Sequence, residues 1–488
     1  MLFNSYSFVV FFIIMLALHS MNFPWKVKKV NLLIGSYIFY AAWNPPFILL
    51  LWLSTVVDFF VGKALYNENN KQKKRLLLVV SLIGNLGMLC FFKYGNFLLD
   101  NFVTLVNTIG IDYHPAKPSI ILPAGISFYT FTTLCYTIDM YKKEGTPVKT
   151  LLDFSLFVTF FPHLVAGPIV RPHQLVPQFE TPKQATRHQL VNGLFLLSLG
   201  LFMKVVMADT LLASPADSVF QAQNSLLPVD AWAGVLAFSG QIFFDFAGYS
   251  TCAIGAAMCL GFSLPENFKF PYAASGFSDF WRRWHITLSA WLRDYLYIPL
   301  GGNRKGPART YVNLMLTMLL GGLWHGASWT FVVWGALHGV YLCVERLLQQ
   351  RTITTGQPAV AVSRASFVPS FLAGKSINRF ATALFVFLLV TIAWVFFRST
   401  DFSTAWRLLS SMFGMDHNGA ALLSTLDLVK VFLVTGALLA THWLLRDLSI
   451  ENIIHRTNWK VLGVAWAVML ILLVVSQKSS NSFIYFQF

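Results

Sequence analysis

Charged residues are scarce in this sequence, and their scarcity excludes an ordinary soluble protein. Only 12% of the 488 residues are Asp, Glu, Lys or Arg, whereas 56% are hydrophobic. A typical soluble domain has about 25% charged residues. Because a core of this size cannot hold so much apolar surface, we expect a lipid bilayer to be the solvent for much of the chain.

Acidic residues are the scarcer kind, with 21 Asp and Glu against 36 Lys and Arg, which gives a formal net charge of +15. Such a charge can indicate nucleic-acid binding, but these basic residues form no continuous stripe. They lie in short loops between apolar runs, such as 26–29, 71–75 and 282–309, which is the positive-inside pattern. We therefore expect no nucleic-acid partner, cytoplasmic basic loops, and both termini on the outer side.

Cysteine is also sparse. The five cysteines all lie in apolar runs and form no CxxC pair, which argues against a disulfide framework and against a zinc site. We expect no metal centre.

The apolar run near the N-terminus has no preceding Lys or Arg and no following cleavage site, so we expect it to be retained as the first span.

Long apolar runs are what the sequence has in abundance. Roughly eleven to thirteen of them could cross or enter a bilayer, and several are shorter than the ~20 residues of a straight span. We predict an all-α integral membrane protein with membrane helices and re-entrant segments, forming a single polytopic domain over 1–488 with a motif-rich core at 120–345. The runs lie near 5–22, 31–43, 46–62, 76–98, 119–140, 151–167, 190–208, 230–262, 311–323, 327–345, 379–397, 428–445 and 460–476.

Residues that can carry chemistry concentrate between Ser275 and Gly339. On one helix over 275–295, the aromatic side chains share a face and most charged ones fall elsewhere, as in a helix at the membrane interface. Alternatively, the basic residues form a rim for an anionic donor, because guanidinium groups suit phosphate. The candidate donor-binding residues are Trp281, Arg282, Arg283, Trp284, Arg293, Asp294 and Tyr295, with Trp324 further along.

His325 is the strongest catalytic candidate. It lies within LLGGLWHGASW, a largely apolar run with glycine on both sides. Ionisable groups at membrane depth are costly and usually functional, and a broken helix is tolerated there where it lines a cavity. An imidazole titrates near neutral pH and suits general-base work. The structural alternative is a histidine that donates to a backbone carbonyl between packed helices.

Two other buried polar residues are candidates. His285 directly follows Trp284, and amphipathicity alone does not explain it. Asp245, in FFDFAGYS, could orient a histidine or make a structural hydrogen bond. His163 lies at a break bounded by proline and glycine, and we interpret it as a lining or packing residue.

The stretch WRRWHITLSAWLRDYLYIPLGGNR, followed by GGLWHGASWTFVVWGALHG, resembles the membrane-bound O-acyltransferase family. The likeness is greatest to its bacterial polysaccharide branch, which includes alginate O-acetyltransferases. Supporting stretches are LPAGISFYTF, FPHLVAGPIVR, FFDFAGYS, PENFKFPY and the ending FIYFQF, so the resemblance covers nearly the whole chain.

The resemblance implies a ring of helices around a central funnel, with His325 as the signature histidine and His285 at the second family position. It implies a cytoplasmic acyl donor, acetyl-CoA or another thioester, and no tightly bound cofactor. It further implies the inner membrane, a periplasmic acetyltransferase partner and a polysaccharide acceptor. Alginate, peptidoglycan and other envelope glycans remain open, and D-alanyl transfer to teichoic acid is a more distant possibility.

These residues suggest a mechanism as a hypothesis. His325 takes a proton from the attacking hydroxyl, and His285 orients the acceptor or stabilises the developing oxyanion. A covalent acyl-histidine is an open alternative. A lipid or polysaccharide transporter is the alternative from another functional class, since it would also need many spans and polar groups at depth.

Overall fold

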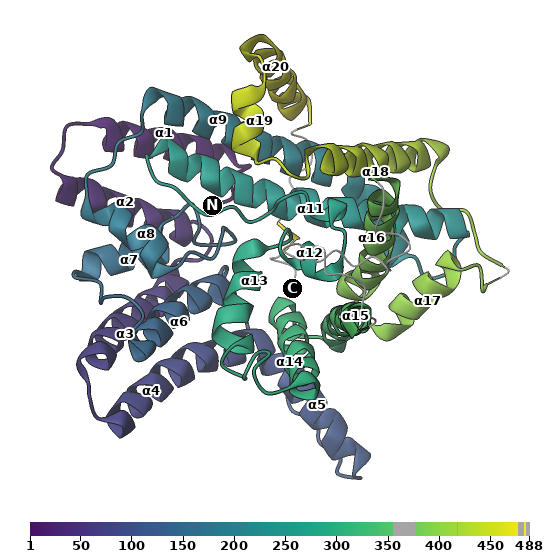
Figure 1. Ribbon diagram of the computed structural model, residues 1–488, viewed down its shortest axis with the longest axis horizontal. Helices are drawn as coiled ribbons and strands as arrows, with labels where there is room; N and C mark the ends of the chain where they lie inside the picture. Colours follow the sequence, from purple (N-terminus) through teal and green to yellow (C-terminus); the bar gives the residue numbers. More distant parts are fainter. Residues whose placement is uncertain (355–375, 417, 477–482, 485–488) are drawn as a thin grey trace. The chain divides into compact units, whose positions relative to one another are not determined.

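The computed structural model describes residues 1–354, 376–416, 418–476 and 483–484, and they are mainly helical (Figure 1). Their β-structure is limited to an isolated bridge between Leu226 and Ala420. The chain divides into two compact units, Met1–Gly200 with Tyr249–Pro265 and Leu201–Gly248 with Glu266–Phe488. The expected single polytopic domain and its funnel stay predictions.

The first unit is built from helices of short and medium length. Its helices are α1 (Tyr6–Ser20), α2 (Trp25–Ala41), η1 (Pro45–Phe47), α3 (Ile48–Asn67), α4 (Lys71–Leu89), η2 (Cys90–Tyr94), α5 (Gly95–Thr108), α6 (Ile126–Lys142), α7 (Leu151–Thr159), α8 (Pro172–Glu180) and α9 (Arg187–Leu201).

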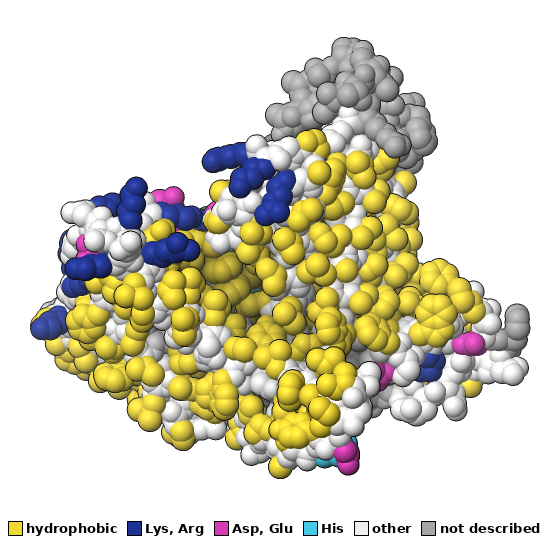
Figure 2. Space-filling view, turned by 90° about the horizontal axis from the view of Figure 1, so that it is seen from below, with side chains coloured by type: hydrophobic (Ala, Val, Ile, Leu, Met, Phe, Trp, Pro, Cys, Tyr) yellow, Lys and Arg dark blue, Asp and Glu magenta, His cyan; other side chains and the backbone are white. Residues whose placement is uncertain are grey.

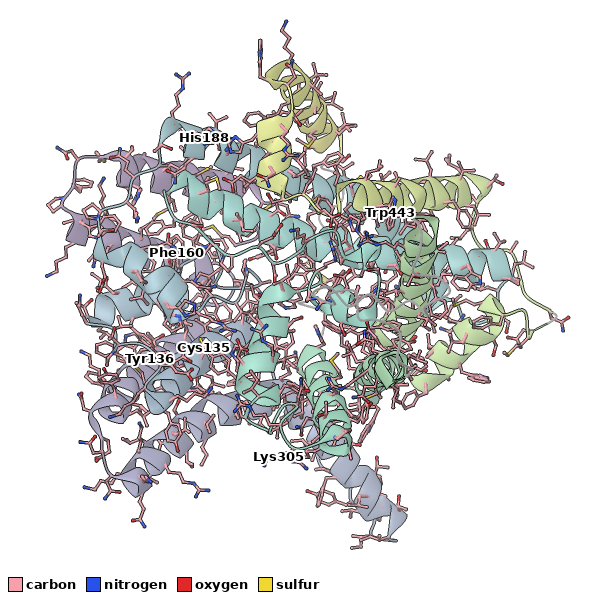
Figure 3. All side chains as sticks on the ribbon, in the orientation of Figure 1. Cys135, Tyr136, Phe160, His188, Lys305 and Trp443 are labelled. Carbon is pink, nitrogen blue, oxygen red and sulfur yellow. The ribbon has the colours of Figure 1, made fainter. Side chains whose placement is uncertain are left out.

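A buried polar network ties three of these helices together. Asp58 on α3 accepts hydrogen bonds from the Ser81 hydroxyl at 2.6 Å and the Asn85 amide at 2.7 Å, both on α4. Thr133 on α6 donates to the Asn85 carbonyl oxygen at 3.2 Å. The ring of Tyr136 on α6 packs against Phe154 on α7, with ring centres 4.6 Å apart (Figure 3). Each buried polar group of the network thus has a partner, as burial requires.

The second unit contains the remaining helices, including those of the segment 275–339. They are η3 (Phe202–Leu212), α10 (Ala213–Gln221), α11 (Pro228–Cys259, whose last turns belong to the first unit), η4 (Pro271–Ala273), α12 (Phe277–Trp281), α13 (Ile286–Leu292), η5 (Arg293–Tyr297), α14 (Pro307–His325), α15 (Trp329–Thr354), α16 (Ser376–Arg398), α17 (Phe402–Met412), α18 (Thr425–Leu445), α19 (Ile450–Arg456) and α20 (Trp459–Val475).

Seven helices in the described part of the chain are long and apolar enough to cross a membrane. They are Pro45–Asn67, Lys71–Thr108, Arg187–Gln221, Pro228–Cys259, Trp329–Gln350, Arg379–Arg398 and Thr425–Leu445. Hydrophobic side chains also cover most of the face seen in Figure 2. A water-soluble protein rarely exposes so large an apolar surface, so the chain is an all-α, multi-pass membrane protein.

The other apolar runs form shorter or more polar helices, and three segments differ from expectation. The run at 151–167 is helical only as far as Thr159, because Pro162 and Gly167 lie in the irregular segment that follows. The interval 275–295 is broken between Trp281 and Ile286 and is not one helix. Helix α15 continues to Thr354, beyond the apolar run predicted at 327–345, and 355–375 lie outside the described residues.

Candidate active site

His325 is the last residue of α14, at a corner between two tightly packed helices. The backbone of α14 approaches that of α15 at paired glycines. A Cβ on Gly322 would lie 2.3 Å from the carbonyl oxygen of Phe331, and a Cβ on Gly335 would lie 2.3 Å from that of Met318. Since real Cβ atoms do not approach that closely, the glycines of the motif are what allow the hairpin. The hairpin places His325 at the C-terminal end of α14, where the backbone breaks as predicted from the glycines.

Aromatic rings enclose the imidazole of His325, which is 3% exposed. The ring centres of Trp324, Trp334 and Phe397 lie 5.0, 5.0 and 5.3 Å away, each in an edge-to-face arrangement. The indole N–H of Trp334 is buried and makes no hydrogen bond to a described residue. The surroundings of His325 therefore combine apolar walls with a nearby N–H donor.

The position of His325 at a helix C-terminus has an electrostatic consequence. The last carbonyl groups of a helix carry partial negative charge, which stabilises a cation within the last turn. A general base becomes positively charged when it accepts a proton. The end of α14 thus stabilises the state that His325 must reach if it acts as a base.

His285 lies in a strained turn between α12 and α13. Its φ is +42° and its ψ is +55°, in the left-handed region that residues with a Cβ rarely adopt. Among the described residues, only two others besides glycine share a positive φ, and one of them is Phe270 in the same segment. Such strain is of order 1–3 kcal/mol and persists only where surrounding contacts enforce it.

Asn267 supplies those contacts. Its side-chain oxygen accepts the backbone N–H of Thr287 at 3.3 Å and the Thr287 hydroxyl at 2.9 Å. The backbone oxygen of Asn267 accepts the N–H of Ile286 at 2.9 Å. Nδ1 of His285 lies 3.1 Å from the same side-chain oxygen. Because a backbone N–H only donates, the Asn267 atom is the carbonyl oxygen, and Nδ1 of His285 must be the protonated nitrogen.

This tautomer decides what His285 can do. Burial lowers the pKa of His285 to about 3, so the ring is neutral at physiological pH. In a neutral ring with the proton on Nδ1, Nε2 bears a lone pair and acts as an acceptor. Of the two roles suggested by the sequence, orienting a hydroxyl fits this state, whereas donating to an oxyanion would need a proton on Nε2.

Trp324 connects the two histidines. Its ring centre lies 5.0 Å from that of His325 and 6.0 Å from that of His285. On its other side His285 meets the edge of Phe246 on α11, with ring centres 4.7 Å apart. The fold thus brings the two predicted catalytic histidines, 40 residues apart in sequence, around one indole ring.

Asp245 contributes to a buried ionic cluster. It forms an ion pair with Lys204 on η3, which also contacts Asp209 at 2.8 Å. Asp245 further accepts the backbone N–H of Ile484 at 2.9 Å, and Phe483 packs against Phe246. These contacts hold residues 483–484 against α11 at Asp245. The next residue, Phe246, packs against His285.

The predicted donor-binding residues occupy different environments. Trp284 is fully buried, stacks on Phe280 and contacts the tilted ring of Trp394, with ring centres 5.7 and 5.1 Å away, so it belongs to the core. Trp281 meets Trp334 edge-on at 5.9 Å and is therefore one ring removed from His325. Both findings correct the expectation of one interfacial aromatic face.

The charged candidates also separate. Arg282 is exposed, and Arg283 is largely buried in a network described below. Arg293 forms a bidentate pair with its neighbour Asp294 at 2.7 and 3.1 Å. Tyr295 packs over Trp291, with ring centres 5.3 Å apart. Whether any of them binds a donor stays a prediction.

Asn267, Lys204 and Trp334 are site residues that sequence reasoning did not single out. Asn267 lies in the stretch PENFKFPY, whose resemblance to the family was the only available signal. Lys204 is a lone cation in an apolar run, and a search for its counter-ion would have found it. In the described part of the chain, no three His, Cys, Asp or Glu side chains gather to hold a metal ion.

Comparison with known proteins matches this site to one family. Residues 148–358 match the family model of the membrane-bound O-acyltransferases. A probable alginate O-acetylase, AlgI of Azotobacter vinelandii, is 40% identical over 415 residues, which cover 85% of this chain and 78% of the relative.

Two further relatives have different names. A peptidoglycan O-acetyltransferase of Helicobacter pylori is 38% identical over 443 residues, covering 85% of this chain and 78% of the relative. A teichoic acid D-alanyltransferase of Streptococcus thermophilus is 27% identical over 265 residues, covering 51% and 63%. The chain belongs to the membrane-bound O-acyltransferase family and is an O-acetyltransferase enzyme.

Proposed function

We propose that this enzyme moves an acetyl group from a cytoplasmic thioester, acetyl-CoA or another acyl thioester, across the inner membrane for O-acetylation of an extracytoplasmic polysaccharide. The observation that carries the proposal is the pair of buried histidines around Trp324. His325 ends a helix whose dipole stabilises a proton acquired there, and His285 presents an acceptor nitrogen.

The proposed step is general-base acyl transfer. Nε2 or Nδ1 of His325 takes the proton of the acceptor hydroxyl while the hydroxyl oxygen attacks the thioester carbonyl carbon. The tetrahedral intermediate collapses as the carbon–sulfur bond breaks. The thiolate then receives the proton from the imidazolium of His325, which yields the ester, the free thiol and the original base.

Two neighbours assist in this proposal. Nε2 of His285 accepts a hydrogen bond from a second hydroxyl of the acceptor and so holds the attacking hydroxyl beside His325. The developing oxyanion needs an N–H donor, and the buried indole N–H of Trp334 beside His325 can supply it. His285 is therefore a positioning group for the acceptor and not an oxyanion donor.

We propose alginate as the acceptor polymer, because relatives named as probable alginate O-acetylases match 85% of the chain at 40% identity. Peptidoglycan is the second candidate, since the H. pylori relative is nearly as similar. In both cases we propose that a periplasmic acetyltransferase partner completes the transfer to the polymer.

The test uses inverted inner-membrane vesicles that contain the enzyme, with the purified partner and either alginate or peptidoglycan fragments sealed inside. Acetyl-CoA labelled in the acetyl group is added outside. We expect labelled acetyl ester on alginate only, whereas label on peptidoglycan only would favour the second candidate. Labelled ester on neither polymer, with wild-type enzyme present and folded, would refute the proposal.

Vesicles sealed without the partner separate direct from covalent transfer. Rapid acid quench after addition of labelled acetyl-CoA traps a labelled protein if His325 carries the acetyl group. We expect no label on His325, because the proposed step transfers acetyl directly to the hydroxyl. A labelled peptide containing His325 would replace the general-base step with a covalent one.

A further inference from the structure

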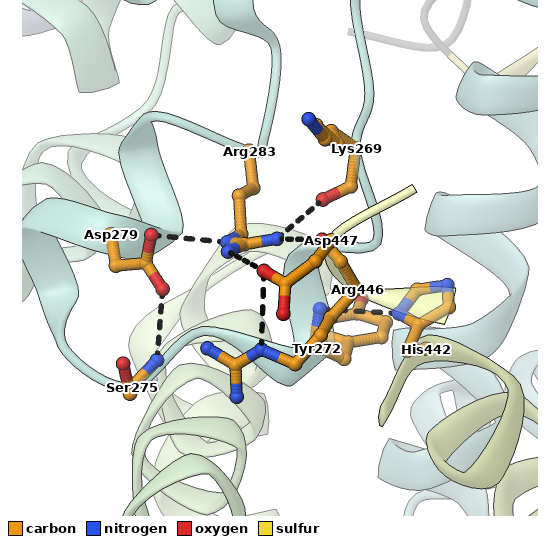
Figure 4. Close-up of polar contacts among 8 residues, drawn as sticks. All are labelled: Lys269, Tyr272, Ser275, Asp279, Arg283, His442, Arg446 and Asp447. Atoms are coloured by element: carbon orange, nitrogen blue, oxygen red, sulfur yellow. Dashed lines mark hydrogen bonds and ion pairs between the residues drawn. The ribbon is translucent and has the colours of Figure 1, made fainter. Parts of the chain in front are cut away.

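Arg283 links three segments close to His285 (Figure 4). Its Nε donates to Asp279 at 3.0 Å, and its Nη1 donates to the backbone carbonyls of Arg446 at 2.7 Å and Lys269 at 3.4 Å. The N–H of Lys269 in turn donates to the carbonyl of Arg283 at 2.9 Å. The connection after α18 is thereby fixed to the strained turn that holds His285.

Arg446, at the end of α18, is the unusual member of this network. Only 7% of the residue is exposed, and neither Nε nor Nη1 makes a hydrogen bond to any described residue. Its guanidinium lies over the ring of Trp443, 4.8 Å from the ring centre. A buried guanidinium with unused donors is costly unless an anion pairs with it.

The nearby carboxylates of Asp447 and Asp279 offset this charge only in part, because they raise the pKa of Arg446 less than burial and the other arginines lower it. Asp279 already accepts from Arg283 and, through its other oxygen, from the N–H of Ser275 at 3.1 Å. Asp447 is 76% exposed, and its nearest oxygen lies 3.9 Å from Nε of Arg446, beyond hydrogen-bond length. Water screens an exposed carboxylate of this kind strongly.

Other cations add to the imbalance. Burial, Arg283 and Arg379 all lower the pKa of Arg446, in that order. Arg379 begins the spanning part of α16 and is exposed. Three arginines thus face two carboxylates, those of Asp279 and the exposed Asp447, which leaves net positive charge around buried donors.

We infer that Arg446 and Arg283 form a binding subsite for a phosphate group. The N–H groups of Nε and Nη1 of Arg446 remain for its oxygens, and such charge-assisted bonds are the strong ones. Arg283 precedes His285 by two residues, so a phosphate held here is anchored directly to the segment that carries the acceptor-binding histidine.

The phosphate has two possible sources, the nucleotide part of the acyl donor and a phospholipid headgroup. The first source rests on the proposed function, because a coenzyme A thioester brings its phosphates to the enzyme as the acyl donor. The loops that contain Arg379 and Arg446 are among those expected on the cytoplasmic side, where both sources occur.

The test compares Arg446→Gln with the matched control Arg456→Gln, an exposed arginine on α19 of the same unit. The donors are acetyl-CoA and acetyl-pantetheine, which has the thioester but no phosphate. For Arg446→Gln we expect KM for acetyl-CoA to rise about 10- to 100-fold, with kcat little changed. We expect no change with acetyl-pantetheine, and none for the control with either donor.

Asp447→Asn provides a second variant with the opposite expected sign. It removes an exposed negative charge beside the subsite, so KM for acetyl-CoA should fall about two- to fivefold. This outcome does not depend on Arg446→Gln being folded. A KM that rises in Asp447→Asn would overturn the inference.

A phosphate-free environment distinguishes the two sources. If the phosphate comes from the donor, the defect of Arg446→Gln persists in micelles of dodecyl maltoside, which has no phosphate. If it comes from a lipid, the defect appears only in phosphatidylglycerol nanodiscs, and it is the same for both donors. Equal KM values for wild type and Arg446→Gln in both environments, or equal defects for both donors in dodecyl maltoside, would overturn the subsite.

A binding measurement keeps this inference separate from the proposed function. Calorimetric titration of purified protein with inorganic pyrophosphate needs no turnover, and we expect wild type to bind it and Arg446→Gln to bind at least tenfold more weakly. An enzyme that binds pyrophosphate in this way but transfers no acetyl group would refute the function and leave the subsite. Acetyl transfer with identical pyrophosphate binding in both proteins would do the reverse.

Discussion

Replacing Asn267 with alanine tests whether His285 acts through its tautomer. The Asn267 side-chain oxygen accepts from Nδ1 of His285 and from both the N–H and the hydroxyl of Thr287. Asn267→Ala removes all three bonds in a position with no exposed surface. The imidazole then loses the contact that places its proton on Nδ1 and the support for its strained backbone.

The size of the effect follows from these bonds. The hydroxyl of Thr287 can rotate to another acceptor, but the N–H of Thr287 and Nδ1–H of His285 cannot, and each unsatisfied donor costs about 1–3 kcal/mol. We therefore expect about 2–6 kcal/mol of destabilisation. Loss of an orienting partner typically reduces activity about 10- to 100-fold, so kcat should fall by that factor.

Thr287→Val is the matched control. It removes one hydrogen bond to Asn267 but leaves the bond to Nδ1 of His285 in place. We expect kcat to change less than about threefold, because the tautomer is retained. If Thr287→Val and Asn267→Ala lower kcat equally, Asn267 acts through general stability and not through His285.

Asn267→Asp adds a pH readout. In the wild type, burial lowers the pKa of His285 to about 3. Nε2 is therefore unprotonated above pH 5, and protonation of His285 does not limit activity there. A carboxylate beside Nδ1 favours the protonated ring and raises that pKa. Activity of the variant should therefore fall as the pH decreases from 8 to 5.5, whereas the wild type should show no such decrease from this group. Acetyl transfer in vesicles at fixed internal pH measures both profiles, and identical profiles would refute the assignment.

Two further substitutions test neighbouring parts of the site. Trp334→Phe keeps an aromatic ring against His325 but removes the indole N–H. We expect kcat to fall about 100-fold with KM unchanged. An unchanged kcat would exclude Trp334 as the oxyanion donor. Lys204→Met leaves Asp209 and Asp245 buried without their cation, which should lower the free energy of unfolding by about 3–5 kcal/mol. The melting temperature of the detergent-purified protein should fall accordingly, whereas exchange of a surface lysine should leave it unchanged.

Most helices could be predicted from the sequence because lipid requires long apolar segments. The runs around α3, α11 and α16 coincide with helices, since a span of about 20 apolar residues permits no other structure. The errors fall where the chain is buried in protein instead. The turn at His285 breaks a continuous 3.6-residue pattern. The hydrogen bonds that stabilise this turn come from Asn267, which no local periodicity indicates.

The candidate site was predictable in part for the same reason. A histidine among glycines in an apolar run is conspicuous, so His325 could be found directly. The tautomer of His285 could not, because it depends on a contact 18 residues away. Arg446 was out of reach as well, since its carbonyl meets Arg283 across 163 residues and its burial depends on packing that composition does not encode.

The most direct test of the central claim is acetyl transfer by His325→Ala in vesicles that contain the same amount of folded enzyme as the wild type. Removal of a positioned base costs about 10²–10⁴-fold, so labelled acetyl ester should become undetectable while labelled donor still binds. Transfer at the wild-type rate by His325→Ala would contradict the account, because no other group described here accepts the proton from the attacking hydroxyl.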